Sequence, residues 1–132
     1  MPEQTSAKLQ LTLFSFGFKY HEPPAASLVF DVRFLPNPYW IETLRPYSGL
    51  DPAVQEYVLN SPEGRRFLEL LQPLLFHIIA EHNRLHKKEL ILAVGCTGGR
   101  HRSVAVIEAL KQHLSHLPIP LKVFHRDIER DT

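Results

Sequence analysis

The sequence predicts an α/β domain with a mixed sheet of about four strands, flanked by helices and carrying a glycine-rich anion-binding βα loop. Two observations point to this fold class. Four short apolar segments have the length and pattern of strands, and helical periodicity separates the later ones. A glycine-rich turn at 95–103 then joins one of these strands directly to a helix. With 132 residues and 44% apolar content, the chain can bury one core, so we expect a single domain over residues 1–132.

The first third of the chain contains two predicted strands. Residues 9–18 alternate between apolar and small or polar side chains, which predicts a strand. Two prolines break this pattern in the loop at 19–24, and residues 27–32 form a second, shorter strand. The irregular segment that follows is rich in aromatic residues and turn formers, as functional loops commonly are. For Trp40 in this segment, we favour a cover of the core edge over stacking on a ligand.

Two helices are predicted before the third strand. Asp51 is an N-cap followed by a proline, which predicts a helix that ends at residue 59. The same signal at residues 60–63 opens a long helix to about residue 86, with apolar residues at three- and four-residue steps. Pro73 should kink or split this helix. Its histidines lack an acidic partner at ligand spacing, so we interpret them as solvated or core-edge side chains and expect no metal site.

The last third of the chain places the glycine-rich turn between a strand and a helix. Residues 90–94 form a nearly continuous apolar run, typical of a strand buried on both faces. Residues 103–114 have helical periodicity, and residues 121–126 predict a final short strand. The charged residues 127–132 are expected to form a tail.

The glycine-rich turn has the composition of a phosphate-binding loop. Its glycines allow positive φ angles and a close approach of the backbone to a ligand. A helix that begins near residue 102 adds unpaired N–H groups and the positive end of its dipole. Arginine side chains suit phosphate oxygens because two N–H groups can bind at once. The candidate ligand-binding residues in this loop are Thr97, Gly98, Gly99, Arg100, His101, Arg102 and Ser103.

Three more candidate ligand residues follow the second predicted strand. Asp31 and Arg33 lie where that strand ends, and ends of strands are where sites occur in open α/β sheets. They form either a surface ion pair of little energetic value, or a ligand contact or an orienter of the anion loop. Asn37 completes the candidate set.

Composition limits the function classes. The formal net charge of +1 excludes the overall basic field of a dedicated nucleic-acid binder, so any RNA binding must be local. The single cysteine, Cys96, excludes an internal disulfide and indicates a reducing compartment, so we expect a cytoplasmic protein. Residues 1–8 lack a signal-peptide core, and no apolar run reaches the length of a membrane span. We expect no cofactor.

Several long motifs resemble the C-terminal domain of the RapZ/YvcJ family. They occur in the same order and span nearly the whole chain, which makes the resemblance more specific than one glycine loop. These motifs lie at 14–20, 29–38, 44–46, 49–51 and 95–104. Members of this family usually carry a P-loop domain ahead of this one, but this sequence has no such motif. We therefore do not expect nucleotide hydrolysis.

The resemblance implies an α/β domain that binds glucosamine-6-phosphate. The pocket residues that it implies are Thr97, Gly98, Gly99, His101, Arg102 and Ser103 of the loop, together with Asp31, Arg33 and Asn37. In the bacterial RNase adapter of this family, the domain also binds a small RNA and an endoribonuclease. A family histidine is replaced here by Tyr39. The residues from Arg126 onward alternate in sign, unlike a polybasic tail, so an RNA or protein partner would be bound weakly. The assembly state, a homo-oligomer included, is left open.

The rival interpretation is an enzyme. The segment from Cys96 to Ser103 also resembles the signature loop of cysteine-dependent phosphatases, in which Cys96 would attack phosphorus, Arg102 would bind the phosphoryl oxygens and Ser103 would assist the thiolate. Gly95 replaces the histidine usual in those families, and no loop presents an obvious general acid, although Asp31 or Asp51 could serve. A third class is a pure interaction module with a structural ion in the loop.

Overall fold

The computed structural model describes residues 9–21 and 25–130. Predictions for residues 1–8, for 22–24 of the first loop and for 131–132 of the charged tail lie outside the described residues. The elements follow in the order β1 (Gln10–Gly17), β2 (Leu28–Asp31), η1 (Pro38–Trp40), α1 (Pro52–Leu59), α2 (Pro62–Arg84), β3 (Glu89–Cys96), α3 (Arg102–Leu114) and β4 (Leu121–His125).

The four strands form one sheet in the order β2-β3-β1-β4, and every neighbouring pair is parallel. The prediction of four strands in a single α/β domain is confirmed, but the expected mixed sheet is wrong. Apolar patterning reports which faces of a strand are buried and carries little information on strand direction. The connections explain the parallel direction: in the chain, strands that are neighbours in the sheet are separated by long crossovers with helices, and such crossovers allow parallel pairing.

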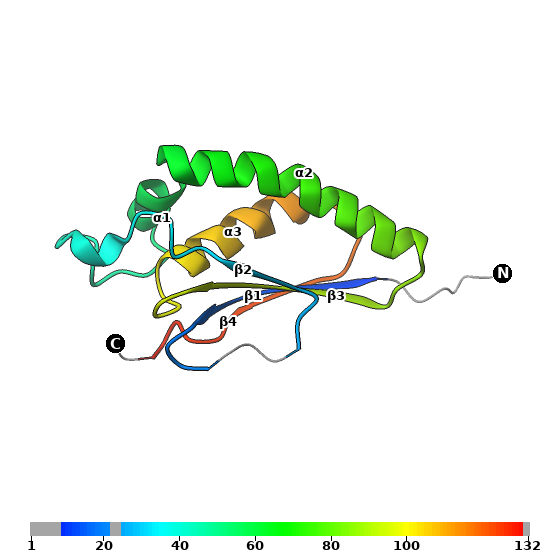
Figure 1. The fold of residues 1–132 in the computed structure, drawn as a ribbon, viewed down its shortest axis with the longest axis horizontal. Coiled ribbons are helices and arrows are strands. Elements are labelled where there is room, and N and C mark those ends of the chain that lie inside the picture. Colours follow the sequence, from blue (N-terminus) through cyan, green and yellow to red (C-terminus); the bar gives the residue numbers. More distant parts are fainter. Residues whose placement is uncertain (1–8, 22–24, 131–132) are drawn as a thin grey trace.

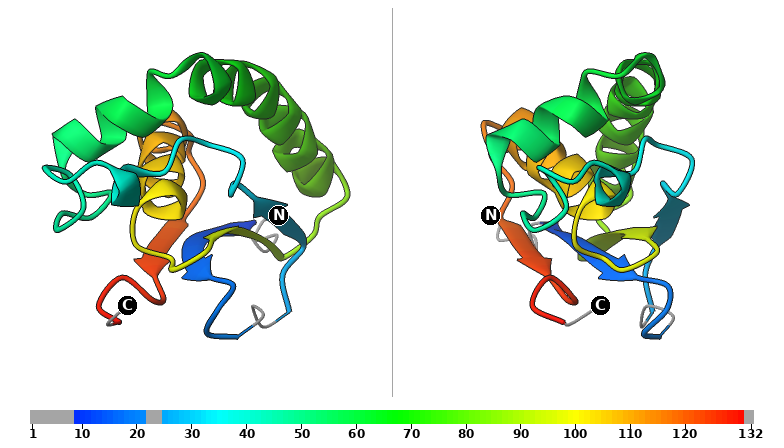
Figure 2. Two further views of the ribbon diagram at one scale, coloured as in Figure 1. Left: turned by 60° about the vertical axis from the view of Figure 1, so that its left-hand side comes forward. Right: turned by 90° about the vertical axis from the view of Figure 1, so that its left-hand side faces the viewer.

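All three helices lie on the same face of the sheet (Figures 1 and 2). The main core fills the space between this helical layer and the sheet, with Leu11, Leu13, Leu92 and Ile107 fully buried. The opposite face carries only a small cluster built on Phe14, Phe16 and Ala93. The domain is therefore a two-layer structure, and the helices flank one face only.

The predicted helix starts are confirmed by their capping bonds. The Asp51 side chain accepts a hydrogen bond from the N–H of Ala53 at 2.9 Å, and Ser61 accepts one from Gly64 at 2.9 Å. The long helix α2 runs through Pro73 without a break and follows a curved path (Figure 2). None of the helices in the described part of the chain combines the length and the apolar character that a membrane span requires.

The parallel arrangement brings the carboxyl ends of all four strands to one edge of the sheet. At that edge the chain leaves the two central strands in opposite directions: residues after β1 pass below the sheet, and residues after β3 rise to α3 in the helical layer (Figure 1). Such a divergence opens a crevice beyond the strand ends, where open α/β sheets bind their ligands. The glycine-rich loop occupies this position.

Candidate functional site

The loop between β3 and α3 keeps its backbone donors unpaired. Residues 97–101 belong to neither the strand nor the helix. None of their five backbone N–H groups donates a hydrogen bond to any residue that the structure describes. Their carbonyls are used instead: Thr97 accepts from the N–H of Lys19 at 3.2 Å, and Arg100 from that of Gly49 at 2.8 Å. The loop is therefore anchored by its acceptors and leaves its donors for another group.

Close backbone packing supports the loop from behind. Gly99 has a φ of +74°, in the left-handed region that favours glycine, and a Cβ there would lie 2.5 Å from the backbone N of Gly17. A Cβ on Gly17 would lie 2.5 Å from the carbonyl carbon of Gly98. The end of β1 and the loop thus touch backbone to backbone, which explains glycines on both sides without reference to a ligand.

Arg102 is a buried cation without a carboxylate. It begins α3, and only 6% of the residue is exposed. One terminal nitrogen, Nη1, donates to the carbonyls of Arg33 at 2.6 Å and Leu35 at 3.3 Å, and Nη2 donates to the Thr97 hydroxyl at 3.4 Å. Nε has no hydrogen-bond partner, and no described carboxylate lies within ion-pair distance of this guanidinium. The charge is held in place by neutral groups only.

Asp31 and Arg33 form a two-pronged surface pair. Nε and Nη2 of Arg33 donate to the Asp31 carboxylate at 2.7–3.1 Å, and the two side chains are each 48% exposed. The hydrogen bond from Arg33 lowers the pKa of Asp31. Neither side chain lines the pocket beside the loop. Because the carbonyl of Arg33 accepts from Arg102, this turn orients the buried cation through its backbone.

A pocket of about 330 Å³ opens in front of the loop, within the size range of small-molecule sites. Six of the predicted site residues line it: Asn37, Thr97, Gly98, Arg100, His101 and Arg102. Four do not: Asp31, Arg33, Gly99 and Ser103. Among the described residues the lining contains no Asp or Glu, so its charged groups are cationic.

The aromatic wall of the pocket and one lysine were missing from the predicted site. Trp40 and Tyr39 line the pocket with their rings edge to face at 5.2 Å, and Lys19 lines it as well. Trp40 is 72% exposed, so the interpretation of this residue as a cover of the core edge is wrong. The Asn37 cap, which accepts from the N–H of Tyr39 at 3.1 Å, starts the short helix η1 that carries both rings. The signal in the sequence was the Asn-Pro pair before two aromatic residues.

Arg100 and His101 contact the pocket but also hold the fold together. Arg100 donates through its two terminal nitrogens to the carbonyls of Ile128 at 3.1 Å and Pro46 at 2.8 Å. His101 Nε2 lies 3.1 Å from the carbonyl of Arg45, so this nitrogen carries the proton and donates. Burial lowers the pKa of His101 below its usual 6.5, which favours a neutral ring at pH 7.

Cys96 lies at the base of the loop and contacts Ser103. Its Sγ is 3.2 Å from the Ser103 hydroxyl and 3.4 Å from the Ser103 N–H, and only 2% of the residue is exposed. A histidine cannot replace Gly95 here, because even a Cβ would lie 2.5 Å from Cζ of Phe16. The two candidate acids, Asp31 and Asp51, do not line the pocket. The loop therefore has the thiol and the arginine of a phosphatase, without a carboxylate beside them.

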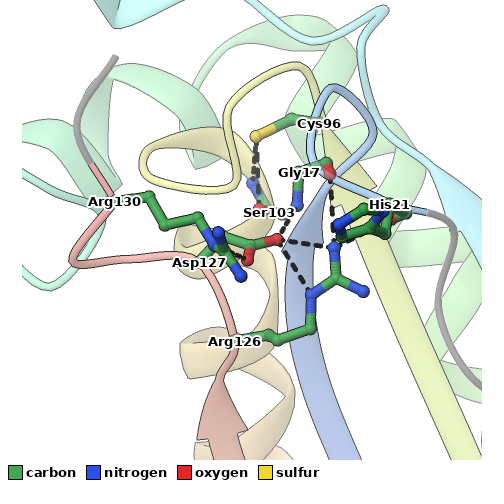
Figure 3. A network of polar contacts seen from close by, with 7 residues as sticks. All are labelled: Gly17, His21, Cys96, Ser103, Arg126, Asp127 and Arg130. Carbon is green, nitrogen blue, oxygen red and sulfur yellow. Dashed lines mark hydrogen bonds and ion pairs between the residues drawn. The ribbon is translucent and has the colours of Figure 1, made fainter.

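The C-terminal turn forms a second polar centre near the loop (Figure 3). Asp127 is fully buried and accepts hydrogen bonds from the Gly17 N–H at 2.7 Å, from Arg126 at 2.8 and 3.0 Å and from Arg130 at 2.7 Å. Burial raises the pKa of Asp127, but these donors outweigh it and hold the pKa below its usual 3.8. The expectation of a simple charged tail is wrong for residues 127–130, because Asp127 is buried there and paired with two arginines.

Comparison with known proteins identifies the family of this domain. The family model for the RapZ C-terminal domain matches residues 9–129. The chain is 48% identical over 128 residues to a nucleotide-binding protein of Trichlorobacter lovleyi, an alignment that covers 97% of this chain and 45% of the relative. It is 46% identical over 130 residues to a nucleotide-binding protein of Mycobacterium avium, with 96% and 44% covered. A nucleotide-binding protein of Caldicellulosiruptor bescii is 44% identical over 129 residues, with 98% and 44% covered.

The described residues contain no group of three His, Cys, Asp or Glu side chains placed to hold a metal ion.

The chain spans less than half the length of each of these relatives, so the matches concern one part of the longer proteins. The family match covers every helix and strand described above, from β1 to the C-terminal turn. The chain belongs to the RapZ C-terminal domain family.

Proposed function

We propose that this domain binds the phosphoryl group of a phosphorylated metabolite in the loop from Cys96 to Ser103. The observation that carries the proposal is the burial of Arg102. Only 6% of this residue is exposed, and its guanidinium has no carboxylate partner among the described residues. An uncompensated buried charge is costly, and proteins ordinarily pair it or bring it against a bound counter-charge. An oxyanion in the adjacent pocket would supply that counter-charge.

Two further features support an anionic ligand. Five unpaired N–H groups precede the helix, and the positive end of the α3 dipole adds to their field. Lys19 and Arg100 add positive charge to the pocket lining, while the described lining residues include no acid. The site therefore combines directional donors with a net positive potential, the two elements that phosphate recognition requires.

The finer proposal is a sugar phosphate, with glucosamine-6-phosphate as the amino sugar that the family resemblance implies. Trp40 and Tyr39 are exposed aromatic residues that line the pocket, and aromatic rings pack well against the apolar side of a sugar ring. A pocket of about 330 Å³ suits a ligand of that size. The relatives named nucleotide-binding proteins make a nucleoside monophosphate the natural competitor in any test.

Calorimetric titration tests the proposal at both levels. Glucosamine-6-phosphate, glucose-6-phosphate, a nucleoside monophosphate and inorganic phosphate would be titrated into the wild type and Arg102→Ala. We expect every binding phosphate ester to lose affinity in Arg102→Ala, while Arg84→Ala, an exposed arginine of α2 paired with Glu81, binds like the wild type. Equal affinity of wild type and Arg102→Ala for every ligand, or no binding at all, would remove the proposal. Equal affinity for both sugar phosphates would remove only the amino-sugar assignment.

An RNA partner is a separate and weaker part of the proposal. Arg126 and Arg130 donate to the buried Asp127 carboxylate, which leaves this turn few free cations for a phosphate backbone. We therefore expect weak binding with a shallow dependence on salt concentration. A gel-shift titration at several salt concentrations measures that slope, and a steep slope would contradict the expectation.

A further inference from the structure

The thiol at the base of the loop is placed for chemistry that phosphate binding does not use. The hydroxyl and the N–H of Ser103 lie 3.2 and 3.4 Å from the Cys96 sulfur; the N–H donates, and the hydroxyl can donate or accept. Both groups can stabilise negative charge on sulfur, and Cys96 also precedes the N-terminus of α3, whose dipole acts in the same direction. The sulfur therefore has contacts that can support a nucleophilic thiolate.

Arg102 provides an independent reason to expect an anion here. Its Nε has no hydrogen-bond partner although the residue is more than nine-tenths buried, and the residue lines the same pocket as Cys96. Among the described lining residues, only the Tyr39 phenol and the Cys96 thiol can form an anion. Of these two, the Cys96 sulfur is the one that lies at the base of the loop, beside Ser103.

We propose that Cys96 is a phosphoryl acceptor for activated phosphate esters, those of phenols and other good leaving groups. The inference rests on the proposed function, since the loop must first hold the phosphoryl group against the sulfur. The thiolate attacks phosphorus, an S–P bond forms, and the P–O bond to the leaving group breaks as that group departs as a phenolate. Water then attacks phosphorus, the S–P bond breaks, and inorganic phosphate and the free thiolate are regenerated.

The lining of the pocket limits this reaction to good leaving groups. An alkoxide, such as the one a sugar 6-phosphate would release, needs a proton from a general acid as it departs. The described lining residues include no carboxyl group; the lining side chains that carry a proton are Lys19, Tyr39 and His101, and His101 already uses its Nε2 proton on the Arg45 carbonyl. Asp31 is paired with Arg33, and Asp127 is enclosed by its own donors. We therefore expect a sugar phosphate to be held and to be cleaved much more slowly than an aryl phosphate.

The missing acid also affects the second step. Attack of water on the phosphocysteine would proceed without a carboxylate to take its proton, so the adduct should break down more slowly than it forms. With 4-nitrophenyl phosphate we expect a burst of 4-nitrophenolate equal to the protein concentration, followed by slow turnover. Intact-mass spectrometry of the acid-quenched full chain should show the mass of one added phosphoryl group.

Matched variants and substrates separate the outcomes. Cys96→Ser should abolish both the burst and the adduct, whereas Arg84→Ala, at an exposed arginine of α2, should show both as the wild type does. Glucose-6-phosphate should bind to the wild type with at most slow turnover. Wild-type protein that binds phosphate but shows neither burst nor adduct would overturn this inference and leave the proposed function intact. A burst that survives in Cys96→Ser, or rapid cleavage of glucose-6-phosphate, would also overturn it. Absence of both phosphate binding and burst would remove the two proposals together.

Discussion

Asp127 and Arg102 are two buried charged residues near the carboxyl ends of the strands, and they differ in their hydrogen-bond partners. Asp127 is an anion that receives donors from Gly17, Arg126 and Arg130, so its charge is matched within the fold. Arg102 is a cation that donates only to two carbonyls and a hydroxyl. The first centre is complete as it stands, whereas the second lacks a partner of opposite sign.

The comparison separates structural arginines from the one that we propose binds a ligand. Arg126 and Arg130 would be attractive candidates for phosphate binding from composition alone, yet both are directed to Asp127 (Figure 3). Burial by itself does not distinguish the two centres, because both Asp127 and Arg102 are enclosed. The presence or absence of a carboxylate–arginine pair does distinguish them, and on this ground we propose a role in stability for Asp127 and a role in recognition for Arg102.

The largest effect is expected from Arg102→Met, and it should appear in affinity. Removing one side of a buried charged interaction typically costs about 2–5 kcal/mol, which corresponds to a loss of phosphate affinity of roughly 30-fold or more. The free energy of unfolding without ligand should change by less than about 1 kcal/mol, because the variant also removes an uncompensated buried charge. Titration calorimetry and urea denaturation measure the two quantities. A large loss of stability with unchanged affinity would reverse the assignment.

Asp127→Ala should show the opposite pattern. Loss of the carboxylate removes the shared acceptor of Arg126, Arg130 and the Gly17 N–H, and breaking such a centre costs on the order of 3 kcal/mol in the free energy of unfolding. Urea denaturation monitored by circular dichroism measures this loss. Glu129→Ala, an exposed carboxylate in the same turn, is the matched control and should be nearly neutral. Equal effects of the two substitutions would mean that burial of Asp127 has no special role.

The same centre predicts a dependence of stability on pH. The folded-state pKa of Asp127 is below its unfolded value of 3.8, so the unfolded chain binds the proton first as pH falls. The contribution of Asp127 to stability is thus fully present above the unfolded pKa and is lost as pH falls through the lower folded-state pKa. Thermal melts between neutral and acidic pH should show this loss in the wild type, with a smaller acid-dependent decrease in Asp127→Ala. Parallel curves for the two proteins would refute the linkage.

The smallest effect is expected at the exposed pair. Arg33→Ala removes the side-chain partner of Asp31 but keeps the carbonyl to which Arg102 donates. Exposed ion pairs contribute little to stability, so the melting temperature should stay within the scatter of replicate melts. Phosphate affinity should likewise be retained, because this side chain does not line the pocket. A marked loss of affinity would return Arg33 to the list of ligand contacts.

Local sequence signals predicted the helices and strands well, because such signals act over a few neighbouring residues. Caps at Asp51 and Ser61, strand alternation and the glycine cluster each leave such a mark. Features that depend on distant partners have no such local signal in the sequence. The parallel direction of the strands is set by the crossovers, and the burial of Asp127 is set by Gly17, more than a hundred positions away.

The aromatic wall shows a different limit of sequence analysis. A tryptophan is expected to be largely buried, because most large rings are covered on folding. Trp40 is instead exposed on a single turn of 3₁₀ helix that is capped by Asn37. Arg100 illustrates the converse case, since a residue expected only to bind ligand also ties the loop to the carbonyls of Pro46 and Ile128. In both positions the role of the side chain depends on segments that meet only in the folded chain.

Gly17 belongs to both centres at once. Its N–H is bonded to Asp127, and its α-carbon side rests against the backbone of Gly98 and Gly99. The final residues of the domain therefore act as a brace for a loop that precedes them by a whole helix and a strand. A change that re-routed residues 126–130 should therefore loosen the loop proposed to bind the ligand, even though no residue in that loop had changed.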